Sequence, residues 1–94
     1  MILDDKLNEI RNSLDGETTT HILQHIGYKI YPRNKFKLRE DERSASTSVR
    51  SKDGLIKDFG SDYSGDIIDL LREYHDMSFE EAVKYVATCL GIEL

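Results

Sequence analysis

Residues 57 to 71 are KDFGSDYSGDIIDLL, and the hydrophobic pattern changes its period within this segment. Its first residues, KDFG, continue a stretch in which polar and apolar side chains alternate, which is typical of a strand. After Ser64-Gly65 the apolar residues Ile67, Ile68 and Leu71 recur at helical spacing. We therefore expect a strand to end here and a helix to follow over residues 65 to 75.

The residues before this segment predict a small antiparallel sheet. SASTSVRS (44–51) is rich in small and β-branched residues, and LIKDFG (55–60) is its expected partner strand. The Asp53-Gly54 pair between them favours a hairpin turn of type I′. YKIYPRNKFKLRE (28–40) also alternates, with a turn expected at Pro32-Arg33-Asn34 between strands. The sheet should therefore contain three or four strands.

Two helices are expected before the sheet. Leu3, Leu7, Ile10 and Leu14 recur at spacings of three and four, and Gly16 should end the helix that they define. A short second helix is predicted over residues 19–26. Its expected caps are Thr18 or Thr19 at the start and Gly27 at the end.

The last helix is expected to begin at a capping box formed by Ser78 and Glu81 and to continue to Gly91.

The fold class is therefore α+β: a small antiparallel β-meander flanked by two N-terminal and two C-terminal helices. The 94 residues fit one domain, residues 1–94, with residues 1–15 as an N-terminal helical extension.

Composition narrows the class of protein. One cysteine, Cys89, allows neither a disulfide framework nor a four-cysteine zinc site, which favours a reducing, cytoplasmic setting. No apolar run is long enough for a membrane span, and the acidic N-terminus is unlike a secretory signal. The net charge is -5, but residues 29–57 hold nine basic side chains against four acidic ones. A nucleic-acid backbone would meet this basic middle third.

The predicted sheet carries the candidate binding residues. Lys35, Lys37 and Arg39 alternate along one expected strand, so their side chains should share a face. The phosphate-contacting set predicted here is Lys35, Lys37, Arg39, Arg43, Arg50 and Lys57. The aromatic residues interspersed with it, Tyr28, Tyr31, Phe36 and Phe59, could stack on unpaired bases, and Tyr31 joins the predicted set. Phe36 is expected to point into the core, and the alternative for the lysines and arginines is a solvated sheet face.

No pattern indicates catalysis. His21 and His25 have a spacing that could share a metal, but a third ligand is missing, so a structural pair is favoured. The acids Asp58, Asp62, Asp66 and Asp69 could suggest Mg²⁺, yet acids are favoured in first helical turns without any metal. We expect a non-enzyme with no catalytic residues, no bound metal and no cofactor.

The segments above resemble the zinc-binding domain of bacterial and phage DNA primases over roughly residues 20–94. EDERSASTSV (40–49) is similar to the family's first strand region, with Arg43 at its basic position and Ser46 at its serine. GLIKDFGSDYSGDIIDLL (54–71) is similar to its second hairpin strand and following helix, and retains Phe59-Gly60. SFEEAVKYVATCLGI (78–92) is similar to its last helix.

The resemblance fails at the metal ligands. Lys37 and Glu40 stand where the family has its first cysteine and its histidine, and Asp58 and Ser61 stand where it has paired cysteines. We therefore expect a degenerate domain without zinc. The N-terminal helix is the expected replacement for the metal, with an exposed salt bridge from Lys37 or Arg39 to Asp58 adding little.

The resemblance implies a non-catalytic module that binds single-stranded DNA in replication or priming. It would act as an accessory to a primase, polymerase or helicase of a phage or mobile element. The alternative is a protein–protein interaction module, a regulator or inhibitor of a replication or defence protein, that uses the acidic C-terminal third. The sequence does not determine an oligomeric state.

Overall fold

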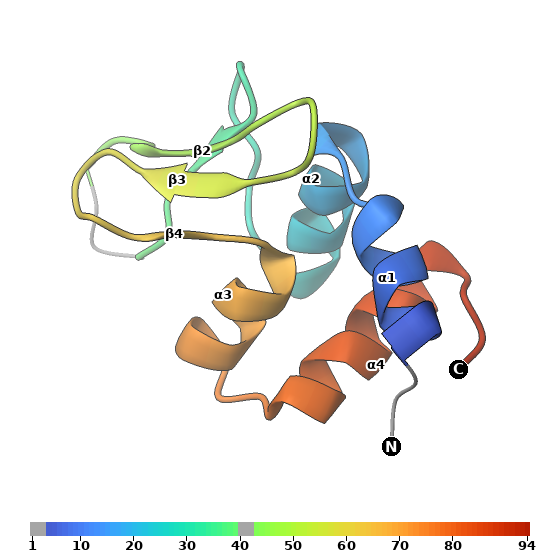
Figure 1. Cartoon of the computed structure of the whole chain (residues 1–94). Coiled ribbons are helices and arrows are strands. Elements are labelled where there is room, and N and C mark those ends of the chain that lie inside the picture. Colours follow the sequence, from blue (N-terminus) through green and yellow to red (C-terminus); the bar gives the residue numbers. More distant parts are fainter. Residues whose placement is uncertain (1–3, 40–42) are drawn as a thin grey trace.

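The structure, a computed structural model, describes residues 4–39 and 43–94. The elements follow in the order α1 (Asp4–Asn12), α2 (Gly16–Ile26), β1 (Lys35–Phe36), β2 (Thr47–Val49), β3 (Ile56–Asp58), β4 (Ser64–Gly65), α3 (Ile67–Tyr74) and α4 (Phe79–Leu90). Figure 1 shows the strands together, with α3 and α4 below them and α1 beside α4. The predicted α+β class, with a meander between two pairs of helices, is confirmed.

The sheet has the order β1-β2-β3-β4, and each neighbouring pair is antiparallel. Its fourth strand is β4, in a segment where sequence analysis expected the start of a helix. Residues 28–31 do not form a strand, and only Tyr31 makes an isolated bridge, to Lys35. Of the two strands predicted within residues 28–40, on either side of the Pro32-Arg33-Asn34 turn, only the second is present, and it is shorter than predicted because β1 ends at Phe36.

The hairpin loop between β2 and β3 differs from the predicted type I′ turn. Arg50 N–H donates to the Leu55 carbonyl at 2.8 Å, so the loop spans residues 51–54. Gly54 has a left-handed φ of 75°, whereas Asp53 is absent from the positive-φ residues that a type I′ turn would require. The Asp53 carboxylate accepts from Leu55 N–H at 3.1 Å, which stabilises the longer loop. The predicted turn at Pro32-Arg33-Asn34 is confirmed.

Asp15, and not a threonine, is the N-cap of α2. Its carboxylate accepts from Thr18 N–H at 2.8 Å, and the Thr18 hydroxyl accepts from Asp15 N–H at 2.9 Å. This reciprocal pair lets α2 begin at Gly16, which was predicted to end the first helix. Gly16 is also tightly enclosed, since a Cβ there would lie 2.6 Å from Ser51 Cα.

The C-terminal helices follow the sequence closely. Asp66 and Asp69 form a capping box for α3, and Ser78 and Glu81 form the predicted one for α4. Gly91 ends α4 with a left-handed φ of 75°.

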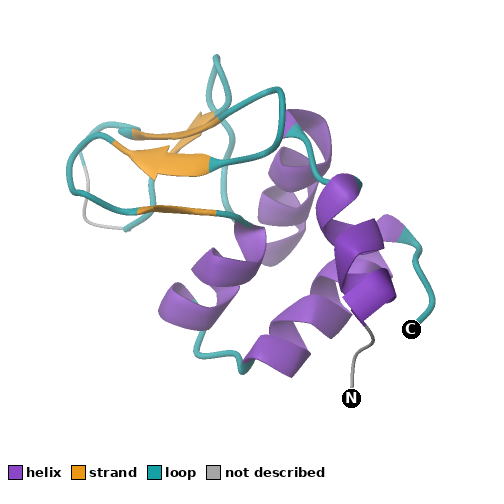
Figure 2. Cartoon of the chain, viewed as in Figure 1, coloured by secondary structure: helices purple, strands orange, loops and turns teal. Residues whose placement is uncertain are grey.

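The helices bury one face of the sheet, as Figure 2 shows by separating helices from strands. The fully buried core joins Phe36 and Ile56 of the sheet to Ile67 and Leu71 of α3 and to Val83 of α4. In α1, Ile10 is fully buried, whereas the predicted Leu3 lies outside the described residues. Within the described part of the chain, no helix is both long and apolar enough to cross a bilayer.

Candidate nucleic-acid interface

One polar row crosses all four strands on the face of the sheet that the helices leave uncovered. Register pairs Lys35 with Ser48, Ser48 with Lys57, and Lys57 with Ser64. Their neighbours Phe36, Thr47 and Asp58 are buried on the other face. Because strands lie about 4.8 Å apart, the backbones of Lys35 and Lys57 are roughly 10 Å apart. We call Lys35, Ser48, Lys57 and Ser64 the polar row.

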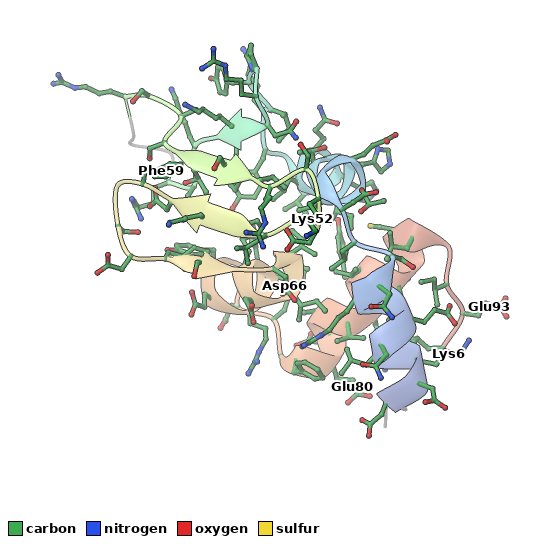
Figure 3. The ribbon with its side chains drawn as sticks, turned by 45° about the horizontal axis from the view of Figure 1, so that its top comes forward. Lys6, Lys52, Phe59, Asp66, Glu80 and Glu93 are labelled. Carbon is green, nitrogen blue, oxygen red and sulfur yellow. The ribbon has the colours of Figure 1, made fainter. Side chains whose placement is uncertain are left out.

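Phe59 extends this surface at the end of β3. Its side chain is 69% exposed, which is unusual for a large apolar residue in a small domain. The Lys57 ammonium lies 5.8 Å from the centroid of the Phe59 ring, within range of a cation–π contact. Figure 3 shows Phe59 at the end of the sheet remote from α1 and α4. Phe59 was named among the aromatic residues that could stack on bases but not in the predicted contact set, although its alternation with buried Asp58 could have placed it beside Lys57.

Lys37 and Tyr31 lie together at the β1 edge of the sheet. The Lys37 ammonium is 5.9 Å from the Tyr31 ring centroid, and the Lys29 ammonium is 5.1 Å from it. Lys29 was counted in the basic middle third but was not predicted as a contact. Arg43 is exposed in the segment before β2, outside any strand.

Two predicted contact residues, Arg39 and Arg50, form ion pairs with acidic side chains and do not belong to the polar row. The Arg50 guanidinium forms a bidentate ion pair with the Asp53 carboxylate. In this pair Arg50 Nε lies 2.8 Å from Asp53 Oδ1. Arg39 follows the end of β1 and donates to Asp58. The prediction that Lys35, Lys37 and Arg39 share one strand face is wrong for Lys37 and Arg39, because β1 ends at Phe36.

Asp58 is the centre of a hydrogen-bonded cluster that joins three segments of the chain. Its side chain is fully buried, and its oxygens accept from four donors. These are Ser46 Oγ at 3.0 Å, Gly60 N–H at 3.0 Å, Ser61 Oγ at 2.8 Å and Arg39 Nη2 at 3.2 Å. The expected salt bridge is present, but it is not the exposed pair that sequence analysis described. We call these five residues the Asp58 cluster.

The Asp58 cluster makes stability depend on pH. Burial acts to raise the pKa of Asp58, but the hydrogen bonds from Gly60, Ser61, Ser46 and Arg39 outweigh it and lower the pKa from 3.8 to about 2. A lowered folded-state pKa stabilises the fold above pH 3.8, and this contribution disappears as pH falls through about 2. The shift corresponds to about 2 kcal/mol.

Urea unfolding between neutral pH and pH 2 should show this loss, and the slope should be smaller in Asp58→Asn. The difference between the two proteins isolates Asp58, because the lowered pKa values of Asp15 and Glu81 are common to both. Equal slopes would mean that the cluster does not hold the carboxylate ionised.

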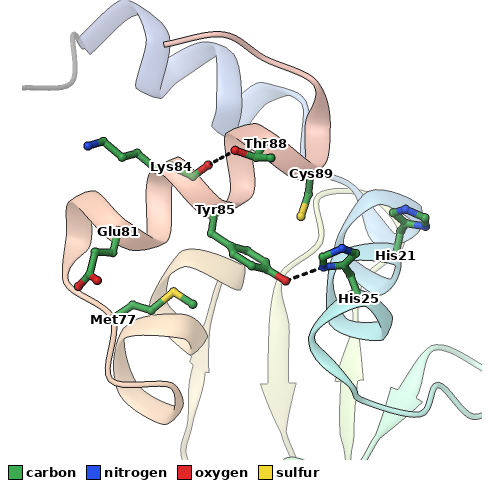
Figure 4. Close-up of a pocket in the computed structure, with 8 residues that line it drawn as sticks. All are labelled: His21, His25, Met77, Glu81, Lys84, Tyr85, Thr88 and Cys89. Atoms are coloured by element: carbon green, nitrogen blue, oxygen red, sulfur yellow. Dashed lines mark hydrogen bonds between the residues drawn. The ribbon is translucent and has the colours of Figure 1, made fainter.

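The two predicted histidines lie beside a groove between α2 and α4, shown in Figure 4. His25 Nδ1 is 2.6 Å from the Tyr85 hydroxyl, so that ring has a structural partner. The acids also have other roles, since Asp66 and Asp69 cap α3 and Asp58 is in its cluster. Within residues 4–39 and 43–94, no group of three or more His, Cys, Asp or Glu side chains is arranged to hold a metal.

Comparison with known proteins identifies the family. A family model described as CHC2 zinc finger matches residues 36–94, which is more than half of the chain. The chain therefore belongs to the CHC2 zinc finger family. It is also similar to a DNA primase of Lactococcus lactis subsp. lactis (strain IL1403), with 38% identity over 53 residues. Those residues are 56% of this chain and 8% of that protein, so the match spans a small part of the relative. The predicted resemblance to primase zinc domains is confirmed.

The residues that the resemblance places at the family's metal ligands carry neither a thiol nor an imidazole. Structural zinc sites use cysteine sulfur and histidine nitrogen in tetrahedral sets. Here Ser61 donates its hydroxyl to Asp58, and the Lys37 ammonium lies by the Tyr31 ring. Cys89 lies on α4, away from this cluster, and Glu40 is outside the described residues. The Asp58 carboxylate and the Ser61 hydroxyl at this position therefore satisfy each other.

Proposed function

We propose that this domain binds single-stranded DNA through the polar row and Phe59, without catalysing a reaction. The observation that carries the proposal is the exposed Phe59 ring beside the Lys57 ammonium, on the sheet face opposite buried Asp58. An aromatic ring next to a cation is suited to stacking an unpaired base and holding its phosphate. Duplex DNA would not present its bases to such a ring.

The rest of the surface fits this role. Lys35 and Lys57 stand on alternate strands of the polar row, so they can contact successive parts of one phosphate backbone. Ser48 and Ser64 supply hydroxyls between and beside them. Membership in the CHC2 family and the similarity to a DNA primase favour DNA as the ligand. We further propose an accessory role beside a primase, polymerase or helicase in the cytoplasm, in a phage or mobile element.

Fluorescence anisotropy of a labelled single strand, titrated over a salt series, tests the binding. We expect Phe59→Ala to weaken binding about tenfold through lost stacking. Lys57→Glu should also weaken it, and should lower the dependence of log K on log salt by at least about one unit. Lys52→Glu is the matched control, because Lys52 is exposed but lies in the hairpin loop at the other end of the sheet.

Equal losses in Lys52→Glu and Lys57→Glu would show a diffuse charge effect and contradict a site on the polar row. Absence of binding at low salt would contradict the proposal altogether. That result would favour the alternative that the domain docks on a protein through its acidic C-terminal third, which holds nine acids and two bases over residues 58–94.

A further inference from the structure

A second aromatic and basic site adjoins the β1 edge of the sheet. It is a cavity of about 480 Å³ between the end of α2, the turn before β1 and the end of α3. The side chains that define its chemistry are Tyr28, Lys29, Tyr31, Lys37, Tyr74 and His75. Of the described residues that line it, none is acidic. The cavity is therefore complementary to an anion that carries a flat ring.

Two tyrosine rings of this cavity, those of Tyr28 and Tyr74, pack against neighbouring side chains before any ligand binds. The Tyr28 hydroxyl is 2.8 Å from His75 Nε2, and the Tyr28 ring packs edge-on against Phe36 at 5.2 Å. Tyr74 packs edge-on against Tyr63 at 5.5 Å and remains 39% exposed. A ligand ring would thus meet side chains that have little conformational freedom left to lose.

The cations of the cavity converge on one ring. The ammonium groups of Lys29 and Lys37 lie 5.1 and 5.9 Å from the Tyr31 ring centroid. A base could stack on the tyrosine ring, and the two ammonium groups beside the ring could bind the phosphate of that nucleotide.

The cavity is continuous with the polar row. Tyr31 N–H donates to the Lys35 carbonyl at 2.7 Å, and Lys35 N–H donates back to the Tyr31 carbonyl at 3.3 Å. Tyr31 is therefore fixed to the strand whose Lys35 begins the row. A single strand of DNA that crosses the sheet from Phe59 toward β1 would reach this cavity.

We propose that this cavity receives one unpaired base, with its phosphate on Lys29 and Lys37, from the same single strand that stacks on Phe59. The inference rests on the proposed function and adds a second base site to it. The DNA would thus be held at two aromatic positions, Phe59 at the end of β3 and Tyr31 beside β1. An oligonucleotide too short to reach both Phe59 and the cavity can use only one of the two aromatic sites. Shortening the oligonucleotide below this length should therefore weaken binding by more than the removal of one nucleotide from a longer oligonucleotide does.

Anisotropy with a labelled oligothymidylate tests the second site. Tyr31→Ala should weaken binding about tenfold, whereas Tyr31→Phe, which keeps the ring, should stay near wild type. Lys29→Gln combined with Lys37→Gln should lower the salt dependence by about 0.7 unit, the value for one neutralised phosphate of a single strand, compared with no change in Lys52→Gln. In NMR, the ring signals of Tyr31 and Tyr74 should shift on adding unlabelled oligothymidylate but not on adding inorganic phosphate.

The outcomes separate the two proposals. If Phe59→Ala weakens binding while Tyr31→Ala and the double lysine variant do not, the second site is wrong and the proposed function stands. If wild type does not bind at low salt, both are wrong. If Tyr31→Ala loses its folded circular dichroism signal, the double lysine variant and the tyrosine ring shifts decide the matter. If inorganic phosphate shifts the Tyr31 and Tyr74 ring signals as much as the oligonucleotide does, the cavity binds only an anion. That result would contradict the proposal that it binds a base.

Discussion

Asp58→Ala should lower the free energy of unfolding by about 3 kcal/mol, measured by urea denaturation at neutral pH. The substitution removes a fully buried carboxylate and leaves the Ser46 and Ser61 hydroxyls and the Gly60 N–H without this acceptor. The loss should lie at the lower end for a broken buried ion pair, because the Arg39 side chain is 42% exposed and can be hydrated again. For a domain of this size the melting temperature should fall by at least about 10 °C.

The matched control is Asp62→Ala, which removes the same side chain from an exposed position in the same loop. It should change the free energy of unfolding by less than about 0.5 kcal/mol. Asp58→Asn keeps the shape but turns an amide NH₂ toward donors, so an intermediate loss is expected. If the Asp58 cluster holds its three segments together without a metal, a chelator should leave the unfolding of the wild-type protein unchanged. Equal unfolding of Asp58→Ala and Asp62→Ala would contradict a stabilising cluster.

The burial of Asp58 shows where sequence analysis stopped short. The pairing of Arg39 with Asp58 was expected, but as an exposed pair of small effect. Alternation alone could have corrected this, because Asp58 lies between exposed Lys57 and exposed Phe59 and so must face the core. The donors from Ser46 and Ser61 could not be predicted, since they depend on how the loop after β3 folds back on the segment before β2.

Helices defined by both periodicity and caps were the predictable part of the fold. Ser78 and Glu81 fixed the start of α4 because both halves of the capping box are visible in the sequence. Asp15 was missed because the nearby threonines offered alternative caps for α2. Strand β4 could not be found by any pattern, since a strand of two residues has no measurable period. Of the candidate site, the lysines of the polar row were predictable from strand parity, and the cavity at Tyr31 required the positions of α2 and α3.

Ile10→Ala should lower the free energy of unfolding by about 3 kcal/mol, because it empties a fully buried position in α1. The resemblance predicts that this helix replaces the metal as a source of stability, and α1 contacts α4 in the folded chain. A domain of this size has little core to spare, so one cavity should be a large fraction of its stability. Denaturant unfolding monitored by circular dichroism measures the loss.

Asn8→Ala, on the exposed side of the same helix, is the control and should change stability by less than about 0.5 kcal/mol. Ile10 packs in the core with the helices, whereas the polar row lies on the uncovered face of the sheet. Ile10→Ala should therefore leave single-strand affinity unchanged at temperatures where the variant stays folded. If Ile10→Ala and Asn8→Ala unfold alike, α1 is not docked in solution and the Asp58 cluster carries the fold without it. If affinity falls together with stability, the helical core and the binding face of the sheet are coupled.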